Sequence, residues 1–396
     1  MATEHPFHHT DTIVMTPQDA SEVSGEFVDL DGERFYAIRN VDQMPPFFIS
    51  VISNDDHWLF VSSTGGLTAG RVSPDTALFP YITVDKIHDS TTHTGSMTLM
   101  RVRTTHGWQE WDPFTSNQDG RFSRCRNLYK SILGNKLCFE EINHDLGIAF
   151  RYTWLTSDDY GFVRTCELEN LRGDDVDVEF LDGLQNILPA GTPRFTQTNS
   201  SNLVDAYKWT EFDADSGLAM FTLFSGITDR AEPCESLKAN VAYCLGLDTP
   251  EVLICSEQAY RFKGGQDLDA ESIKRGVRGA FLVRSNMTLA AGDCRTWQIV
   301  ANSELSQADV VRLRHELRDQ DVLASTIRES VDRGSDGLAR IMASSDGFQG
   351  TGEETVATHH YSNVLFNVLR GGIFSDQYQI SRDDLRRTIR SFNRPV

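Results

Sequence analysis

Two tryptophans and two carboxylates fall within six residues of the sequence, the segment Trp-Gln-Glu-Trp-Asp-Pro at positions 108–113. Sugars present apolar C–H faces that stack on indole rings, and their hydroxyls donate to carboxylates. Trp108 and Trp111, with Glu110 and Asp112, therefore predict a carbohydrate-binding element. The alternative is a strand end whose tryptophans are core and whose acids are solvated. The two acids could also be an acid/base pair, which on a glycoside must lie roughly 5–10 Å apart.

Other segments carry weaker chemical signals. Residues 63–70 (Ser-Thr-Gly-Gly-Leu-Thr-Ala-Gly) are glycine-rich but lack the lysine of a phosphate-binding loop, so a tight turn between strands is expected. The 11 histidines show no ligand spacing, and His359 and His360, as neighbours on a helix, point about 100° apart. The sequence also has no G-x-S-x-G segment. We therefore predict no metal site, no cofactor and no serine nucleophile.

The seven cysteines are scattered, and no pair has Cys-x-x-Cys spacing. Several lie in apolar runs, which favours buried, reduced thiols and a reducing compartment. The first 33 residues contain no Lys or Arg, unlike the start of a secretory signal. These features together predict a cytoplasmic protein. The cysteines are Cys125, Cys138, Cys166, Cys234, Cys244, Cys255 and Cys294.

The formal net charge is −20, and it is unevenly distributed. From Ser306 onward 13 acids face 12 arginines, so the first 305 residues carry almost all of the excess. An acidic surface repels phosphate backbones and anionic lipid heads. Nucleic acid and membrane are therefore poor partners, whereas a neutral sugar is indifferent to this charge.

Residues from about 25 to about 303 alternate like a series of strands. In residues 147–156, Ile148, Phe150, Tyr152 and Trp154 alternate with mixed residues, which predicts one inward and one outward face. Two further pairs of runs, one around residues 172–175 and one around residues 291–293, predict hairpins. Short strands without intervening helices favour a large antiparallel β-sandwich.

At Ser306 the pattern becomes helical. Ser306 and Asp309 have the spacing of a capping box, apolar residues then recur at helical intervals, and Gly334 is expected to end that run. Residues 344–354 are expected to form a loop. A helix with an apolar stripe follows, and Ser381 with Asp384 predicts the cap of another. The stripe of the first of these two helices comprises Tyr361, Leu365, Val368 and Leu369.

The helices after Gly352 have few apolar partners left in the sequence. A domain that has only begun cannot bury its own faces. We therefore expect the chain to be truncated, with Leu365, Leu369 and Leu385 not all covered by its own residues.

Several segments, in order, resemble the cellobiose phosphorylase family of glycoside phosphorylases and its cyclic β-1,2-glucan synthase relatives. The segments are Phe-Phe-Ile-Ser at 47–50, residues 58–71 with their Ser-Thr-Gly-Gly turn, Trp-Asp-Pro-Phe at 111–114, the strand pair 147–187, residues 289–297, and residues 361–374 with Asn363, Asn367 and Arg370.

This resemblance implies a galactose-mutarotase-like supersandwich followed by helices. The expected division is a polar tail (1–24), the β-supersandwich (25–304), a helical linker (305–352) and the start of an (α/α)₆ catalytic barrel (353–396). The resemblance also implies a parent enzyme that cleaves β-glucosidic bonds with inorganic phosphate and inverts the anomeric centre. Its single general acid would lie beyond this chain. No catalytic residue is then expected here. Arg370 is a candidate substrate or phosphate contact, and the 108–113 loop a candidate dimer element.

Two alternative hypotheses place the protein in other functional classes. The first is a stand-alone carbohydrate-binding protein, motivated by the 108–113 cluster. The second is an epimerase acting on the anomeric carbon, which needs a histidine and a carboxylate converging on one sheet face. His88, His93 and His106 are the candidate histidines for that reading.

Overall fold

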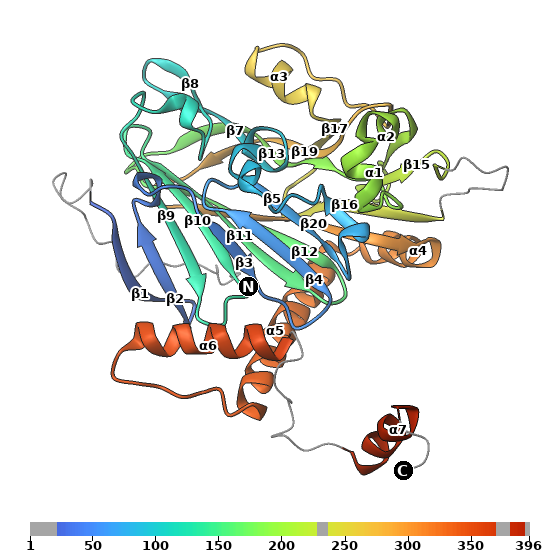
Figure 1. The fold of residues 1–396 in the computed structure, drawn as a ribbon. Helices are drawn as coiled ribbons and strands as arrows, with labels where there is room; N and C mark the ends of the chain where they lie inside the picture. The colour runs from blue at the N-terminus through green and yellow to red at the C-terminus, as the bar shows by residue number, and fades with distance from the viewer. Residues whose placement is uncertain (1–21, 228–236, 370–380, 393–396) are drawn as a thin grey trace.

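The computed structural model describes residues 22–227, 237–369 and 381–392, and these form mainly antiparallel strands arranged in three sheets (Figure 1). The predicted large antiparallel β fold followed by helices is confirmed. The largest sheet has eleven strands in the order β1-β2-β9-β10-β11-β12-β20-β16-β15-β14-β18. Its members are β1 (Ser24–Leu30), β2 (Glu33–Arg39), β9 (Arg124–Ser131), β10 (Leu137–Asn143), β11 (Ile148–Ser157), β12 (Gly161–Asn170), β14 (Lys208–Asp213), β15 (Leu218–Leu223), β16 (Lys238–Leu245), β18 (Ile273–Arg275) and β20 (Cys294–Ser306).

Two smaller sheets and the helices complete the described chain. The five-stranded sheet, in the order β17-β19-β13-β7-β8, consists of β7 (Gly95–Thr104), β8 (Gly107–Trp111), β13 (Val176–Ile187), β17 (Glu251–Cys255) and β19 (Gly279–Leu289). The four-stranded sheet consists of β3 (Phe48–Val51), β4 (His57–Ser62), β5 (Leu67–Arg71) and β6 (Ala77–Phe79). The helices are α1 (Arg194–Asn199), α2 (Ser201–Tyr207), α3 (Glu257–Lys263), α4 (Gln307–Glu316), α5 (Gln320–Ser344), α6 (Glu354–Leu369) and α7 (Arg382–Phe392).

The main core lies between the eleven-stranded sheet and the two smaller ones. Ile148, Phe150, Tyr152 and Trp154 are all buried in it, as their alternation predicted. Across the layers, the ring of Trp297 on β20 stacks on that of Phe180 on β13, with centroids 4.8 Å apart. Stacked aromatic pairs of this kind add to the burial of apolar area. The sandwich is therefore held by interdigitating aromatic side chains.

Both predicted hairpins are wrong. β12 and β13 flank residues 172–175, yet β12 pairs with β11 and β20, whereas β13 pairs with β7 and β19. β19 and β20, on either side of residues 291–293, also lie in different sheets. The chain crosses from one layer to the other at both turns. Alternation and turn residues are the same for a crossover and a hairpin, so the sequence could not separate the two.

Asn170 joins the two crossovers. Its buried Nδ2 donates to the carbonyl of Asp174 in the first crossover, at 2.8 Å, and to those of Leu289 and Ala290 at the second, at 3.1 and 2.9 Å. A buried amide so placed satisfies carbonyls that no strand neighbour reaches. The turn predicted at residues 63–70 is confirmed in part: residues 63–66 form the tight connection between β4 and β5, whereas residues 67–70 belong to β5.

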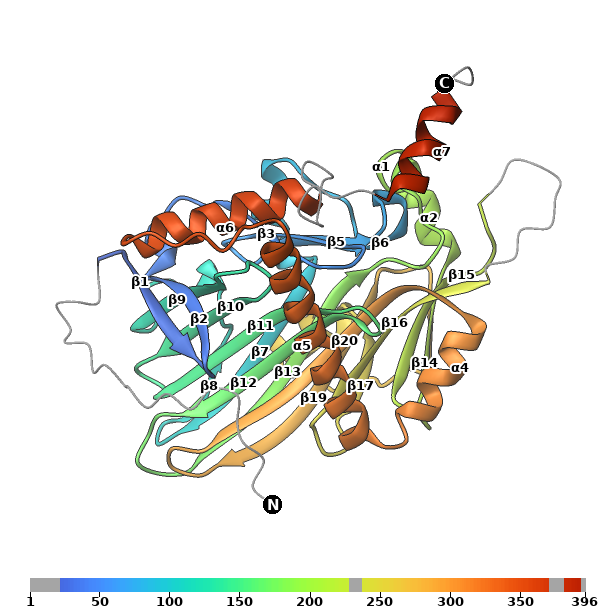
Figure 2. The same ribbon diagram turned by 90° about the horizontal axis from the view of Figure 1, so that it is seen from below.

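The helices α4 and α5 cover the other face of the eleven-stranded sheet, and Figure 2 shows α5 running across it. The predicted capping box at α4 is confirmed, with Asp309 N–H donating to Ser306 Oγ and Asp309 accepting from Ser306 N–H. The expected stop at Gly334 is wrong, because α5 continues to Ser344. A Cβ at Gly334 would lie 3.0 Å from Asn54 Oδ1, so this glycine serves close packing.

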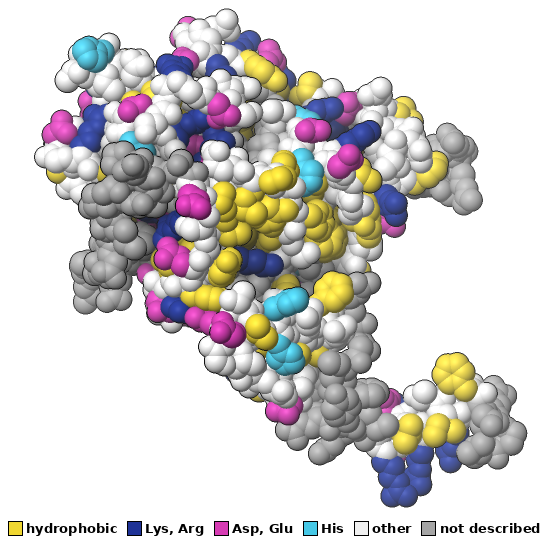
Figure 3. Space-filling model, turned by 60° about the vertical axis from the view of Figure 1, so that its left-hand side comes forward, with side chains coloured by type: hydrophobic (Ala, Val, Ile, Leu, Met, Phe, Trp, Pro, Cys, Tyr) yellow, Lys and Arg dark blue, Asp and Glu magenta, His cyan; other side chains and the backbone are white. Residues whose placement is uncertain are grey.

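The apolar stripe of α6 is only partly covered. Leu365 is fully buried against α5, while Leu369 is 40% exposed, and Leu385 on α7 is 43% exposed. Ser381 Oγ accepts from Asp384 N–H at 3.5 Å, in agreement with the predicted cap of α7. Figure 3 shows the arginines and the hydrophobic side chains of this helix on opposite sides.

Six cysteines lie in the described residues, and all six are free thiols; Cys234 lies outside that part of the chain. Burial raises the pKa of the Cys138 thiol to about 12, so it stays protonated at neutral pH. Among the described helices, none combines the length and apolar character needed to cross a bilayer.

Candidate functional site

The outer face of the five-stranded sheet carries a polar surface with one prominent aromatic. Strand register places Trp108, Arg103, Asp177 and Thr288 in one row across β8, β7, β13 and β19. The next row on the same face holds Glu110, Arg101, Glu179 and Asn286. Alternate residues of paired strands share a face, so these two rows form one surface, called here the Trp108 face.

Trp108 rises at the edge of a shallow depression in this face. Its side chain is 47% exposed, and the depression has a volume of about 440 Å³. Asp177, Glu179, Asn286 and Thr288 supply its polar atoms. The guanidinium of Arg103 lies 5.5 Å from the indole centroid, a cation–π contact that fixes the ring. The result is an exposed aromatic platform beside carboxylate and amide groups.

Ion pairs hold the polar groups of the Trp108 face in place. Glu179 accepts from Arg101 at 3.2 Å and from Arg284 at 2.7 Å, and Arg284 also reaches Glu251 at 3.1 Å. The hydrogen bond to Glu179 raises the pKa of Arg284, against partial burial. Thr288 Oγ1 donates to Asp177 at 2.7 Å. The carboxylates are thus pre-oriented on a rigid sheet, which is what precise ligand recognition requires.

The two predicted acids have different surroundings. Glu110 is exposed on the Trp108 face. Asp112 follows β8 and pairs with Lys263 at the end of α3, while its backbone N–H donates to Gln118. Asp112 therefore anchors α3 against the β8 segment, and the structure gives it a partner that an acid/base pair with Glu110 would have to displace.

Trp111 does not fit the predicted sugar-stacking role. Its side chain is fully buried in the main core, and Nε1 donates to Glu141 Oε1 at 2.7 Å. Glu141 also accepts from the backbone of Phe114 and from Arg126, both at 2.7 Å. On β8, Trp108 and Trp111 are three residues apart, and an odd spacing puts them on opposite faces of a strand. The core alternative weighed for this tryptophan is the correct one.

The remaining predicted residues are dispersed. Arg370 lies outside the described residues. His88 Nδ1 lies 2.7 Å from Ser62 Oγ, and His93 Nδ1 lies 3.2 Å from Thr92 Oγ1. His106 is exposed in the turn between β7 and β8. His88 and His93 therefore contact hydroxyl groups. The epimerase hypothesis instead requires a histidine close to a carboxylate.

Within the described residues one group has metal-ligand proximity: Asp55, Asp56 and His57. Arg71 already pairs with both aspartates, at 2.7 and 2.5 Å. Burial, and then the charge of Arg71, lower the pKa of His57 to about 3, so its imidazole is neutral. The guanidinium supplies the positive charge that a metal ion would otherwise bring.

A second, partly exposed aromatic surface lies on the four-stranded sheet. The segments 47–50 and 58–71 were noted for their family resemblance, but no binding surface was predicted there. Phe48 and Phe60 have centroids 5.2 Å apart, and Trp58 lies 6.2 Å from Phe60 and 5.3 Å from Tyr81. Figure 3 shows hydrophobic side chains gathered in a band across one face of the molecule. The alternation of Trp58 and Phe60 along β4 was the available sequence signal.

The polar members of the Trp108 face were also missed as a group. Asp177 and Glu179 alternate with the buried Val176, Val178 and Phe180. Their outward orientation could therefore be predicted from the sequence. Their proximity to Trp108 depends on the pairing of β13 with β7 and of β7 with β8. Such long-range pairing is not encoded in local alternation.

No protein-family model matches the sequence, and no curated protein matches it. Among solved structures, it is similar to a bacterial glucoamylase complexed with acarbose, at 8% identity and TM-score 0.40, over 84% of this chain and 40% of that one. A chain described as a kojibiose phosphorylase from the human microbiome gives 9% identity and TM-score 0.32, over 84% and 32%. A galactose mutarotase-like protein from Clostridium acetobutylicum gives 7% and 0.31, over 71% and 98%. The chain thus spans less than half the length of the first two proteins, and these similarities assign no residue a role.

Proposed function

We propose that this chain is the carbohydrate-binding β-sandwich and linker region of a carbohydrate-active enzyme. The observation that supports it is the Trp108 face, where a half-exposed indole stands beside pre-oriented carboxylate and amide groups. An indole face removes the apolar side of a sugar ring from water, and neighbouring oxygens accept its hydroxyl protons. An open, shallow face suits a section of an oligosaccharide chain.

The Trp108→Ala variant tests this role. Isothermal titration with β-gluco-oligosaccharides should show saturable binding by the unmodified chain. The variant should lose about five- to thirtyfold in affinity, since one stacking platform contributes on the order of 1–2 kcal/mol. Tyr260→Ala removes an aromatic of α3 that is 75% exposed and lies outside the depression, and it should bind normally. Equal binding by the chain and both variants would count against the proposal.

The finer proposal concerns the parent reaction. The ordered motifs that resemble the cellobiose phosphorylase family support phosphorolysis of β-glucosides, with inorganic phosphate as co-substrate and a catalytic barrel as partner. In this proposal the barrel supplies the general acid, and the present chain shapes substrate access and the interface of a homodimer. A stand-alone carbohydrate-binding protein would use the same Trp108 face, so it remains the second candidate.

An activity assay separates a binding region from a complete enzyme. Residues 1–396 incubated with cellobiose and phosphate should release no glucose 1-phosphate above the no-protein blank, because in this proposal the catalytic barrel supplies the general acid. Robust phosphate-dependent turnover by this chain would contradict the non-catalytic role.

A further inference from the structure

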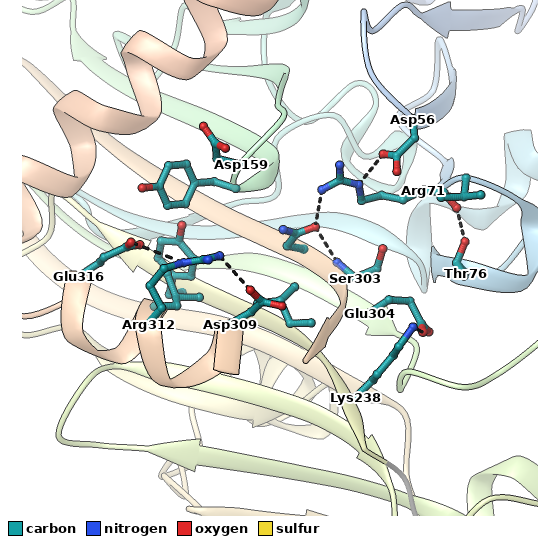
Figure 4. A pocket seen from close by; sticks show the side chains of 16 residues that line it. Asp56, Arg71, Thr76, Asp159, Lys238, Ser303, Glu304, Asp309, Arg312 and Glu316 are labelled. Carbon is teal, nitrogen blue, oxygen red and sulfur yellow. Dashed lines mark hydrogen bonds and ion pairs between the residues drawn. The ribbon is translucent and has the colours of Figure 1, made fainter. Parts of the chain in front are cut away.

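A second concave site lies between the sandwich and the first linker helix, called here the α4 cleft. Its volume is about 360 Å³, and Figure 4 shows that its walls come from the end of β5, the end of β20 and the side of α4. The β11–β12 turn contributes Asp159 and Tyr160. This volume falls near the lower end of the roughly 300–1,000 Å³ of small-molecule sites. A compact ligand fits it better than a polymer.

Two hydroxyls in the wall of this cleft are buried without a hydrogen-bond partner. Tyr243 on β16 is 1% exposed and Ser303 on β20 is 6% exposed, and neither Tyr243 Oη nor Ser303 Oγ has a partner in the described structure. Burial raises the pKa of Tyr243 well above its usual value, and the charges of Tyr160 and Glu316 raise it further. A buried hydroxyl left unpaired is destabilising. Each hydroxyl can therefore form a hydrogen bond that the described residues do not supply.

The backbone around the cleft is strained at two positions. Val72 has φ 57° and Glu304 has φ 63°, and both residues line the cleft. A β-branched residue with positive φ is uncommon, because its Cβ crowds the backbone. Glu304 N–H donates to Asn240 Oδ1 at 2.8 Å, which holds the bend in β20. Such strain tends to persist where the wall of a site must have a particular shape.

The charges of the cleft exclude an anionic ligand. Arg312 pairs with Asp309 at 3.1 Å and with Glu316 at 3.7 Å on α4. Arg71 pairs with Asp56, and Lys238 with Glu304 at 3.2 Å. The lining contains five carboxylates and three cationic side chains, so its net charge is negative. A phosphate or carboxylate would be repelled, while hydroxyl donors find many acceptors.

We propose that the α4 cleft binds a small neutral polyol, such as a single sugar residue. Its oxygens accept from Tyr243 Oη and Ser303 Oγ, and its hydroxyls donate to Glu304, Asp309 and Glu316. The walls belong both to the sandwich and to α4, so the bound polyol clamps the linker helix onto the sheet. This site is separate from the Trp108 face and does not depend on the function proposed there.

Titration calorimetry in the Trp108→Ala background tests the proposal without a contribution from the other face. D-Glucose and myo-inositol are the neutral probes, and glucose 1-phosphate is the anionic one. At least one neutral probe should bind saturably and more tightly than glucose 1-phosphate. Tyr243→Phe and Ser303→Ala should each weaken that binding by about tenfold, the effect of losing one well-placed hydrogen bond. Tyr260→Phe, remote on α3, should leave it unchanged.

Thermal unfolding keeps the test independent of folding defects. Tyr243→Phe removes no protein hydrogen bond, so its Tm without ligand should equal or exceed that of the parent. Amide exchange of α4 should slow when the binding probe is added to the parent and not to this variant. The proposal is overturned if neither neutral probe saturates, if glucose 1-phosphate binds as tightly, or if both cleft variants bind like the parent. A crystal structure with the probe soaked in, showing only ordered water between Tyr243 and Ser303, would also overturn it.

Discussion

At the scale of single residues, one buried guanidinium pairs with three carboxylates. Arg151 donates to Glu140 at 2.6 Å and to both Glu167 and Glu169 at 2.7 Å. Burial opposes ionisation of Glu140, but Arg151 and hydrogen bonds from Asn127 and Tyr129 outweigh it and hold its pKa at about 2. Burial raises the pKa of Glu167 to about 7, and Arg151 offsets this only in part. One cation cannot stabilise three carboxylates equally.

The raised pKa of Glu167 and the lowered pKa of Glu140 make their contributions to folding stability depend on pH in opposite directions. The folded pKa of Glu167 exceeds its usual value of 4.5, so its contribution to stability is full below pH 4.5 and is lost as pH rises through 7. Glu167→Gln should therefore match the parent at pH 4 and exceed its free energy of unfolding at pH 8 by the order of 1–3 kcal/mol. Urea unfolding at both pH values measures this difference.

Glu140→Gln is the matched control for that measurement. Its folded pKa lies below 4.5, so the carboxylate stabilises the fold above pH 4.5, and this stabilisation is lost as pH falls through about 2. The variant should be less stable than the parent at pH 8. Loss of stability at pH 8 in both variants would mean that Glu167 is ionised and well paired.

The sequence predicted some residues of the two candidate sites and not others. Segment composition located Trp108 and Glu110, and both lie on the face where a ligand is proposed. Composition could not show whether Trp111 is buried or binds sugar, because both roles use the same residue type. Tyr243 and Ser303 carry no local signal at all, since only the tertiary structure shows that their hydroxyls lack partners.

At the scale of elements, glycines in α5 show how packing overrides propensity. Gly334 and Gly337 sit within a helix of 25 residues, where glycine is ordinarily unfavourable. Asn54, between β3 and β4, approaches both. The helix pattern and the cap of α4 were predictable from spacing. The sequence could not predict that α5 continues past Gly334, or that the two expected hairpins are crossovers. Both features depend on contacts between residues distant in sequence.

Gly337→Ala tests this packing through a double-mutant cycle. A Cβ at position 337 would lie 2.9 Å from Asn54 Nδ2, so the variant should lose about 0.5–2 kcal/mol of unfolding free energy as Asn54 is displaced. In an Asn54→Ala background the same change should stabilise the chain by about 0.5–1 kcal/mol, the usual gain of alanine over glycine in a helix. A stabilising effect of the single variant would show that Asn54 moves freely.

At the scale of the whole molecule, the sandwich and the linker helices share a core. Leu313 on α4 and Leu323, Ile327 and Val331 on α5 are buried against Val241, Tyr243 and Val300 of the eleven-stranded sheet. Fully burying one such side chain contributes about 1.5–3 kcal/mol. Four of them approach the roughly 5–15 kcal/mol of a whole domain. The linker is therefore part of the folding unit rather than an appendage.

A chain ending at Ser306 should consequently fold poorly. Without α4 and α5 it exposes the apolar outer side of β16 and β20, so it should bind a hydrophobic dye, self-associate and lose the cooperative thermal transition. A chain ending at Ser345, which keeps both helices, is the control and should unfold cooperatively. A monomeric 1–306 chain with the same Tm as the control would show that the sandwich is autonomous.

The claim that carbohydrate docks on the Trp108 face is tested most directly by indole N–H resonances during titration with β-gluco-oligosaccharides. Trp108, assigned from the spectrum of Trp108→Phe, should shift and saturate, while the signals of buried Trp111, Trp154 and Trp297 stay in place. Saturable binding by calorimetry with an unmoved Trp108 signal, or no shift at any indole at millimolar sugar, would contradict the account.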